Sequence, residues 1–226
     1  MTTTRRRPAP LAWDRVELDL GAFRLADVSL ALAEGEWVAL MGPTGAGKTL
    51  LCETAVGFLA PTGGRVLARG HDLTGRPPED RGIGYAPQDD LLFPHLTVRE
   101  NLGFGMWRGV RAAEVAAAAE GLEIAHLLGR RTATLSGGEG QRVAVGRALL
   151  AGGEVWLLDE CTSALDEDAR ERVGSFLKTW QARAGASVLQ ITHDPAEAER
   201  LADRVVHMSR GRLLAAATEA AAGARP

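Results

Sequence analysis

The sequence predicts a parallel α/β domain that is interrupted by a helical insertion. Short apolar segments typical of strands alternate with segments of helical periodicity, both up to about residue 88 and from about residue 154 onward. Residues 89–153 differ, because they hold few β-branched runs, an alanine-rich stretch and several glycines that punctuate helices. A chain of 226 residues with an ordinary apolar fraction is long enough to bury such a core.

The first strands are expected within residues 15–40, where apolar and polar residues alternate. Breaks at Gly21 and at residues 34–36 divide this segment into two strands and the start of a third. The third strand, Trp37–Met41, is nearly all apolar, so it should lie at the centre of a sheet. A helix over Lys48–Phe58 follows it.

The same alternation continues to residue 192. The further expected elements are strands at Arg65–Ala68, Gly82–Tyr85, Val155–Asp159 and Ser187–Thr192 and a helix from Asp168 to about Arg183. Residues 1–13, which include a basic run beside two prolines, and the alanine-rich residues 215–226 are expected to be flexible.

Charge and cysteine content exclude several classes of protein. A formal net charge of -3 gives no broad basic field, so nucleic acid is not an expected partner. Cys52 and Cys161 lack paired spacing, so neither a metal cluster nor a disulfide framework is expected. The chain has no apolar run approaching the roughly 20 residues that cross a bilayer, and its start lacks a cleavable apolar segment. A cytosolic protein is therefore predicted, unless a partner holds it at a membrane.

The segment GPTGAGKT, Gly42–Thr49, matches the phosphate-binding pattern G-x-x-x-x-G-K-[ST] and lies between an apolar strand and a helix. In this P-loop, backbone N–H groups would face phosphate oxygens, Lys48 would reach the β- and γ-phosphates, and the Thr49 hydroxyl would bind Mg²⁺. An incidental glycine turn is the weaker alternative in that context. The expected nucleotide-binding residues are Gly42, Pro43, Thr44, Gly45, Ala46, Gly47, Lys48, Thr49 and Leu50.

Hydrolysis would need a carboxylate for Mg²⁺ and a group that activates water. Asp159 and Glu160 follow a buried strand and can supply the two, although a strand ending in two solvated acids is the alternative. His193 follows another apolar strand and should emerge at the same sheet edge, within reach of a γ-phosphate; alone, it would more often be a polar cap. Gln88 also follows a strand and could contact Mg²⁺ and the attacking water.

Six features carry a family resemblance. They are, in order, GPTGAGKT, Gln88, LSGGEGQR at residues 135–142, the apolar run into Asp159 and Glu160, Ser163–Asp166, and His193. Together they resemble the nucleotide-binding subunit of ABC transporters, over about residues 15–214. The resemblance implies an ATP- and Mg²⁺-dependent ATPase with a P-loop NTPase fold: an α/β parallel-sheet core, a small antiparallel β subdomain and a helical insertion. A single ABC ATPase domain would then combine a core of about residues 14–88 and 154–214 with a helical subdomain of about residues 89–153.

The resemblance also explains why the chain has a second glycine-rich segment. ABC ATPases pair head to tail, so the signature of one subunit closes over the ATP held by the P-loop of the other. Ser136, Gly137, Gly138 and Glu139 are accordingly assigned to ATP binding across a dimer, a homodimer if both subunits are this chain. The segment around Asp166 would lie at the dimer seam.

Transport is a separate inference from the same resemblance. The residues from Leu91 to His95 look like the surface on which bacterial importers receive a transmembrane permease subunit, although the alternative is that Leu91, Leu92 and Phe93 pack the insertion against the core. The implied system imports molybdate or tungstate, a polyamine or a sugar with a periplasmic or lipid-anchored solute-binding protein, and this subunit sits on the cytoplasmic face of the membrane. A soluble non-transport ABC ATPase or an exporter subunit is the alternative.

Three departures from the family pattern affect these expectations. The chain stops soon after Leu214, where many relatives extend into a substrate-sensing barrel, so feedback through such a domain is not expected. Cys161 stands where relatives carry proline after the catalytic glutamate. Leu20 stands where relatives stack an aromatic ring on adenine; Phe23 is assigned to packing, and Trp13 is a less regular candidate.

Overall fold

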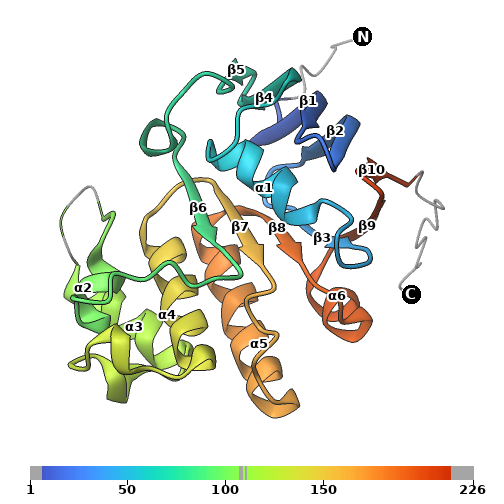
Figure 1. Cartoon of the computed structure of the whole chain (residues 1–226). Coiled ribbons are helices and arrows are strands. Elements are labelled where there is room, and N and C mark those ends of the chain that lie inside the picture. The colour runs from blue at the N-terminus through green and yellow to red at the C-terminus, as the bar shows by residue number, and fades with distance from the viewer. Residues whose placement is uncertain (1–6, 107–108, 110, 215–226) are drawn as a thin grey trace, which may run out of the picture.

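Two β-sheets contain the strands of the part of the chain that the structure describes, and the helices lie beside them (Figure 1). A computed structural model describes residues 7–106, 109 and 111–214. The strands are β1 Leu11–Asp19, β2 Arg24–Leu32, β3 Trp37–Met41, β4 Gly63–Ala68, β5 His71–Asp72, β6 Ile83–Ala86, β7 Val155–Asp159, β8 Ser187–Ile191, β9 Arg204–Ser209 and β10 Arg212–Leu213. The α-helices are α1 Lys48–Val56, α2 Val98–Gly103, α3 Ala112–Gly121, α4 Gly137–Leu150, α5 Glu167–Ala184 and α6 Pro195–Leu201.

The larger sheet has the strand order β10-β9-β3-β8-β7-β6, and its strands run parallel except for the β9–β10 pair. β3 lies between β9 and β8 with four of its five residues buried, which confirms the predicted central position. Because parallel strands end at the same edge, the residues that follow β3, β7 and β8 meet there.

The two faces of this sheet are covered by different cores. Along β7, Val155 and Leu157 pack toward α1 and the smaller sheet, whereas Trp156 and Leu158 pack toward α4 and α5. This alternation follows from the two-residue period of a strand. A strand buried on both faces must be apolar throughout, which is why the run before Asp159 was recognisable in the sequence.

The smaller sheet is antiparallel, has the order β2-β1-β4-β5 and lies over α1. The expectation that residues 1–13 are flexible is wrong for the end of that segment, because β1 begins at Leu11. Leu11 is fully buried, and Trp13 is 2% exposed with its indole Nε1 donating to the Leu51 carbonyl oxygen at 3.1 Å. The prolines before Leu11 concealed the start of the strand. Residues 1–6 and 215–226 lie outside the described residues.

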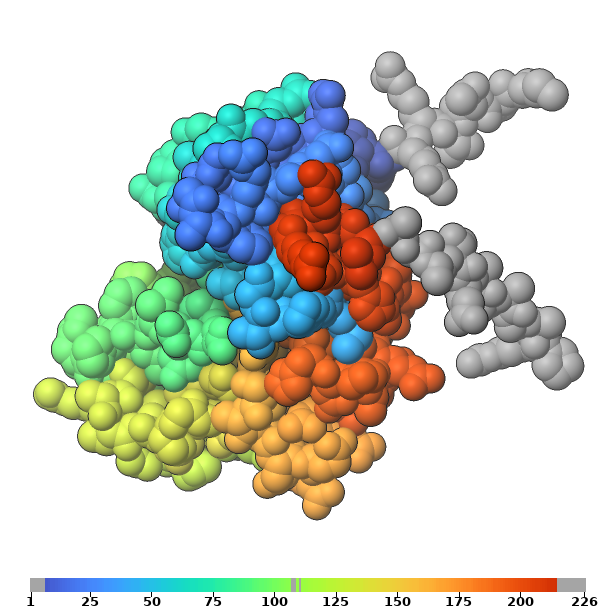
Figure 2. Space-filling model, turned by 45° about the vertical axis from the view of Figure 1, so that its right-hand side comes forward, coloured from blue at the N-terminus to red at the C-terminus, as the bar shows by residue number. Residues whose placement is uncertain are grey.

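The helices α2, α3 and α4 form a lobe beside the sheets, seen in green to yellow at the lower left of Figure 1 and in Figure 2. α2 and α4 each begin with a capping box: Thr97 with Glu100, and Ser136 with Glu139. The lobe packs on α5 and the sheet through a continuous apolar core. None of the helices in the described part of the chain has the length and apolar character required to span a membrane.

No helix or strand is predicted from the sequence after Thr192, but the structure contains α6, β9 and β10 there. β9 pairs with β3 and closes the second side of the P-loop strand. The contact is close, since a Cβ atom at Gly42 would lie 2.0 Å from the Met208 carbonyl oxygen, and Gly42 has a φ of 149°. A glycine is therefore required where the P-loop leaves β3.

Candidate nucleotide-hydrolysis site

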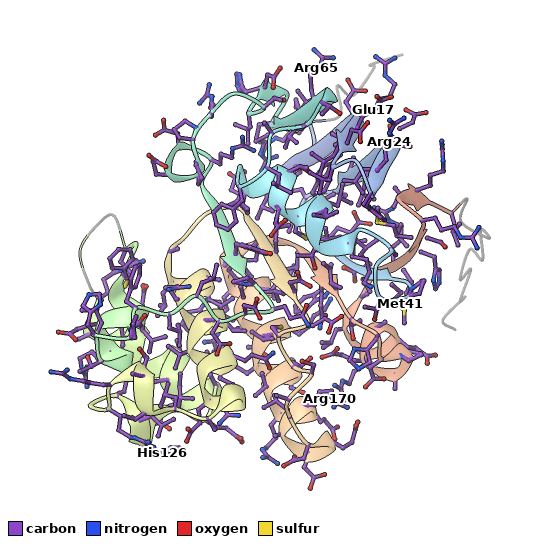
Figure 3. All side chains as sticks on the ribbon, in the orientation of Figure 1. Glu17, Arg24, Met41, Arg65, His126 and Arg170 are labelled. Carbon is purple, nitrogen blue, oxygen red and sulfur yellow. The ribbon has the colours of Figure 1, made fainter. Side chains whose placement is uncertain are left out.

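The P-loop leaves β3 after Met41, which is labelled in Figure 3, and curls over the start of α1. It forms one wall of a pocket that is completed from other elements by Phe23, Gln88 and Glu160. The P-loop residues in the pocket lining are Thr44, Gly45, Ala46, Gly47, Lys48, Thr49 and Leu50. Gly47 caps α1 with a φ of 100°, and a Cβ there would meet the Phe23 ring at 2.9 Å. Residue 47 must therefore be a glycine for the loop to keep this conformation.

Lys48 is almost fully buried and is held by the loop itself. Its Nζ donates to the carbonyl oxygens of Gly42, at 2.9 Å, and Pro43, at 3.0 Å. These two neutral acceptors give the ammonium less stabilisation than an anion would. The lysine is therefore placed to exchange a loop carbonyl for a phosphate oxygen that enters the pocket.

Asp159 ends β7 as a buried carboxylate, 1% exposed, and neither carboxylate oxygen has a hydrogen-bond partner among the described residues. The pKa of Asp159 is raised to about 6, mainly by burial; the nearby Thr49 hydroxyl and Lys48 partly offset this rise, and Glu160 adds to it. Two unpartnered carboxylate oxygens beside a threonine hydroxyl form the hard-oxygen donor set that Mg²⁺ prefers. Asp159 and Thr49, two of the residues predicted from the sequence for this ion, thus fit it by their chemistry.

Glu160 follows Asp159 and turns its side chain to the same pocket. Its backbone has a φ of 50°, a left-handed conformation that is uncommon for a residue with a side chain. His193 follows β8, and its Nδ1 lies 3.9 Å from Glu160 Oε2. Glu160 and the exposed Gln88 thus line the pocket of the P-loop. His193 does not line this pocket, but it lines an adjacent hollow together with Glu160.

The signature segment lies at the start of α4, and its residues are not among those that line the P-loop pocket. The Ser136 hydroxyl donates to Glu139 Oε2 at 3.0 Å, and the Ser136 backbone N–H donates to the same oxygen at 2.8 Å. Gly137 and Gly138 form the first turn, where free backbone N–H groups favour an anion. Ser136 and Gly137 line a separate hollow, which shares no residue with the pocket of the P-loop.

The segment from Leu91 to His95 contains two kinds of apolar residue. Leu91 is 57% exposed, with a φ of 45°. Leu92 packs against the helical core, and the Phe93 ring centroid lies 4.1 Å from that of Phe104. Leu92 and Phe93 therefore pack within the protein, as the alternative interpretation of this segment expected. Leu91 remains at the surface, where it lines a hollow together with Phe58 and Tyr85.

Arg147 of α4 holds this segment and was not identified from the sequence. Its guanidinium donates to the carbonyl oxygens of Leu91, at 2.8 Å, and Asp90, at 3.2 Å, and lies 5.5 Å from the Phe93 ring centroid. The two partners are 56 residues apart along the chain, so no local pattern indicates the contact. Arg147 therefore ties the exposed segment to the helix that carries the signature.

Comparison with known proteins identifies the family. The family model described as ABC transporter matches residues 25–163, which include the P-loop, the signature and Glu160. The chain belongs to the ABC transporter family. A molybdate/tungstate import ATP-binding protein of Pyrococcus horikoshii is 43% identical over 206 residues, which are 89% of this chain and 60% of that protein. One of the same description from Archaeoglobus fulgidus is 44% identical over 204 residues, 88% of this chain and 84% of the relative.

The ABC fold is also evident in solved structures. A dimeric ATP-binding cassette in a post-hydrolysis state, bound to ADP and phosphate, has a TM-score of 0.82 and 27% identity, and the alignment covers 91% of this chain and 97% of that one. The predicted fold class is thereby confirmed: a parallel-sheet ABC ATPase core with a small antiparallel sheet and a helical lobe. The chain spans about 60% of the length of the Pyrococcus protein.

Three residues of this ABC chain are candidates for contact with the nucleotide base. Trp13 is excluded because its ring is buried and hydrogen-bonded. Phe23 packs on Gly47, as expected, but it also lines the P-loop pocket, which was not expected. Leu20 is 49% exposed in the turn between β1 and β2 and is not part of the lining.

Cys161 is buried in the helical core, 2% exposed.

Leu20→Tyr should tighten ATP binding roughly fivefold to tenfold and GTP binding less, because stacking a base on an aromatic ring is worth about 1–3 kcal/mol. A fluorescence titration with each nucleotide measures the change, and Leu214→Tyr, at a leucine that is 52% exposed, is the matched control. If Leu20→Tyr has no effect while Phe23→Ala weakens ATP binding by the same factor, the base stacks on Phe23 instead.

Proposed function

We propose that this chain is the ATP-hydrolysing subunit of a membrane importer and that it works as a head-to-tail dimer around two ATP molecules. The observation that carries the proposal is a pocket that joins the P-loop to Glu160 but contains none of the signature residues. A second chain would complete that pocket by presenting the start of its α4. Similarity to a dimeric cassette with bound ADP and phosphate supports this arrangement.

Each residue of the pocket has a role in this reaction. Backbone N–H groups of residues 44–49 and Lys48 hold the ATP phosphates, with the helix dipole of α1 behind them. Mg²⁺, when bound by Thr49, Asp159 and Gln88, would neutralise charge on the β- and γ-phosphates. Glu160 takes a proton from the attacking water.

His193 and the partner's signature act on the γ-phosphate from the remaining sides. His193, next to Glu160, orients the γ-phosphate by a hydrogen bond. Ser136 and the first N–H groups of α4 contact the nucleotide of the other subunit, for which the Ser136 hydroxyl must leave Glu139. Dimer closure and hydrolysis are thereby linked, since neither chain has a complete site alone.

ATP turnover per subunit should rise with protein concentration and then level off, because two half-sites must meet before hydrolysis begins. Phosphate release from the isolated chain, measured over a wide concentration range at saturating Mg-ATP, tests this. Turnover that is constant from the lowest concentration upward, in a chain that remains monomeric, would contradict the dimeric site.

The importer assignment rests on the relatives and on the surface around Leu91. Both relatives described above carry import names, and we place this chain on the cytoplasmic face of a membrane, bound to a permease subunit that acts with a solute-binding protein. The same names make a molybdate- or tungstate-like oxyanion the first substrate to test. Leu91, Phe58 and Tyr85 provide an exposed apolar hollow for a helix of the permease.

Leu91→Asn should abolish assembly with the permease and leave the ATPase rate of the isolated chain within twofold. Asparagine tolerates the left-handed backbone at this residue, so the fold should be retained while the apolar contact is lost. Affinity purification from detergent-solubilised membranes of the source cells, with Leu214→Asn as the control, measures assembly. Retention of the membrane subunit by Leu91→Asn would place the docking surface elsewhere.

A further inference from the structure

The backbone of Glu160 must be held in its left-handed conformation by its surroundings. A φ of 50° at a residue with a side chain persists where neighbouring contacts fix it. The Glu160 backbone N–H donates to the Ile191 carbonyl oxygen at 3.1 Å, and Gln141 donates weakly to the Glu160 carbonyl oxygen at 3.4 Å. These contacts anchor the backbone of Glu160, and the Ser163 backbone N–H closes a turn after it by donating to the Glu160 carbonyl oxygen at 3.1 Å.

A buried carboxylate holds the loop that follows Glu160. Glu197, in the first turn of α6, is 1% exposed. Thr162 Oγ1 donates to one of its oxygens at 2.6 Å, and Thr192 Oγ1 donates to the other at 2.7 Å. None of the ion pairs between described residues includes Glu197. Burying a carboxylate costs free energy, and side-chain packing alone would not require a carboxylate at this residue.

The two threonines belong to the segments that carry the reacting groups. Thr162 lies two residues after Glu160, and Thr192 lies one residue before His193. Glu197 therefore cross-links the loop of the base to the loop of the histidine. The Thr192 hydroxyl also accepts a hydrogen bond from the Asp194 backbone N–H at 3.1 Å, so both sides of His193 are fixed.

Arg170 makes a second bridge between the same two loops. It belongs to the first turns of α5 and is labelled in Figure 3. Its guanidinium donates to Asp194 Oδ2 at 3.1 Å and to the Leu165 carbonyl oxygen at 2.9 Å. A small hollow is lined jointly by Glu160, His193, Arg170 and Glu197. The loops of the base and of the histidine are thus tied twice, once by a buried anion and once by a cation nearer the surface.

We propose that Glu197 is a positioning residue for ATP hydrolysis, which sets the separation of Glu160 and His193 by binding Thr162 and Thr192; this inference rests on the proposed ATPase function. Neither Glu197 nor either threonine lines the pocket of the P-loop. Loss of the cross-link should therefore leave nucleotide binding intact and slow the chemical step, because a displacement of about 1 Å at a reacting group can cost a hundredfold in rate.

The test removes one hydroxyl group without changing the shape of the side chain. Thr162→Val should lower kcat at least tenfold, while KM for ATP and the affinity for a fluorescent ATP analogue stay within twofold. Thr162→Ser restores the hydroxyl and should recover kcat to within threefold of the wild-type value. Glu197→Asp keeps the charge but is one methylene shorter, so it cannot reach both threonines and should also lower kcat about tenfold.

Thr54→Val is the matched control, because Thr54 is a buried hydroxyl of α1 that donates to the Leu51 carbonyl oxygen at 2.7 Å, away from both loops. It should lower thermal stability and leave kcat within twofold. The inference is overturned if Thr162→Val keeps the wild-type kcat, if Thr54→Val loses as much, or if Thr162→Ser fails to recover activity. A wild-type chain that binds ATP and never hydrolyses it would overturn the proposed function and this inference with it.

Discussion

Glu160→Gln is expected to bind ATP normally, to hydrolyse it at least a hundredfold more slowly and to accumulate as an ATP-bound dimer. The glutamine has the shape of the glutamate, so the pocket with its P-loop wall is preserved. It cannot take a proton from water, and removal of a general base costs about 10²–10⁴-fold in rate. In the proposed mechanism hydrolysis opens the nucleotide-bridged dimer, so a chain that stalls before hydrolysis should remain closed.

Size-exclusion chromatography with light scattering, with and without ATP, measures the dimer. Lys48→Ala is the matched control: it removes the cation nearest the phosphates, so it should bind ATP weakly and stay monomeric at the same concentration. A Glu160→Gln chain that is monomeric at saturating ATP would contradict head-to-tail closure. Turnover close to that of the wild-type chain would remove Glu160 from the role of base.

The parts of the site that the sequence predicts well are those carried by strands buried on both faces. An uninterrupted apolar run ends at Met41 before the P-loop and at Leu158 before Asp159, and such runs can be recognised without knowing their neighbours. The parallel arrangement then places the following polar residues at one edge. For this reason the nearness of Glu160 and His193, 3.9 Å apart in the structure, could be expected from the order of segments alone.

The parts that could not be predicted depend on contacts between distant segments. β9 begins with the exposed Arg204 and Val205 and has the exposed His207 between two buried residues, so it lacks the buried apolar run that marks a central strand, although it borders β3. Thr162 and Glu197 are 35 residues apart, and neither belongs to a local pattern that indicates their bond.

One missed feature did have a local signal. Ser136 followed three residues later by Glu139 is the spacing of a capping box, and the structure contains that box at the start of α4. From the sequence, both residues are predicted to bind ATP. In the single chain, the Ser136 hydroxyl is hydrogen-bonded to Glu139. ATP held by a partner subunit would have to replace Glu139 as the acceptor of this hydrogen bond.

Asp159→Asn should abolish Mg²⁺-dependent turnover and, at neutral pH, stabilise the nucleotide-free chain. The first effect follows because an amide offers Mg²⁺ one neutral oxygen in place of a carboxylate. The second follows from burial, which raises the pKa of Asp159 from 3.8 to about 6 and leaves its two oxygens unpartnered among the described residues. Function and stability thus make opposite demands on the same side chain.

The sign of the pH dependence distinguishes this explanation from a change in packing. Between about pH 4 and 6 the folded chain retains a proton that the unfolded chain has lost, so the free energy of unfolding falls as pH rises through that window. Above pH 6 the buried charge costs up to roughly 3 kcal/mol, at 1.36 kcal/mol per pKa unit. Asparagine has no such charge, so the gain in the free energy of unfolding from Asp159→Asn should be largest near pH 7.5 and about half as large at pH 5.

Urea unfolding without Mg²⁺ at both pH values measures this gain, with Asp168→Asn, at an exposed residue, as the control. A variant that is less stable than the wild-type chain at pH 7.5, or whose advantage does not change with pH, would show that the Asp159 carboxylate is not an uncompensated buried charge.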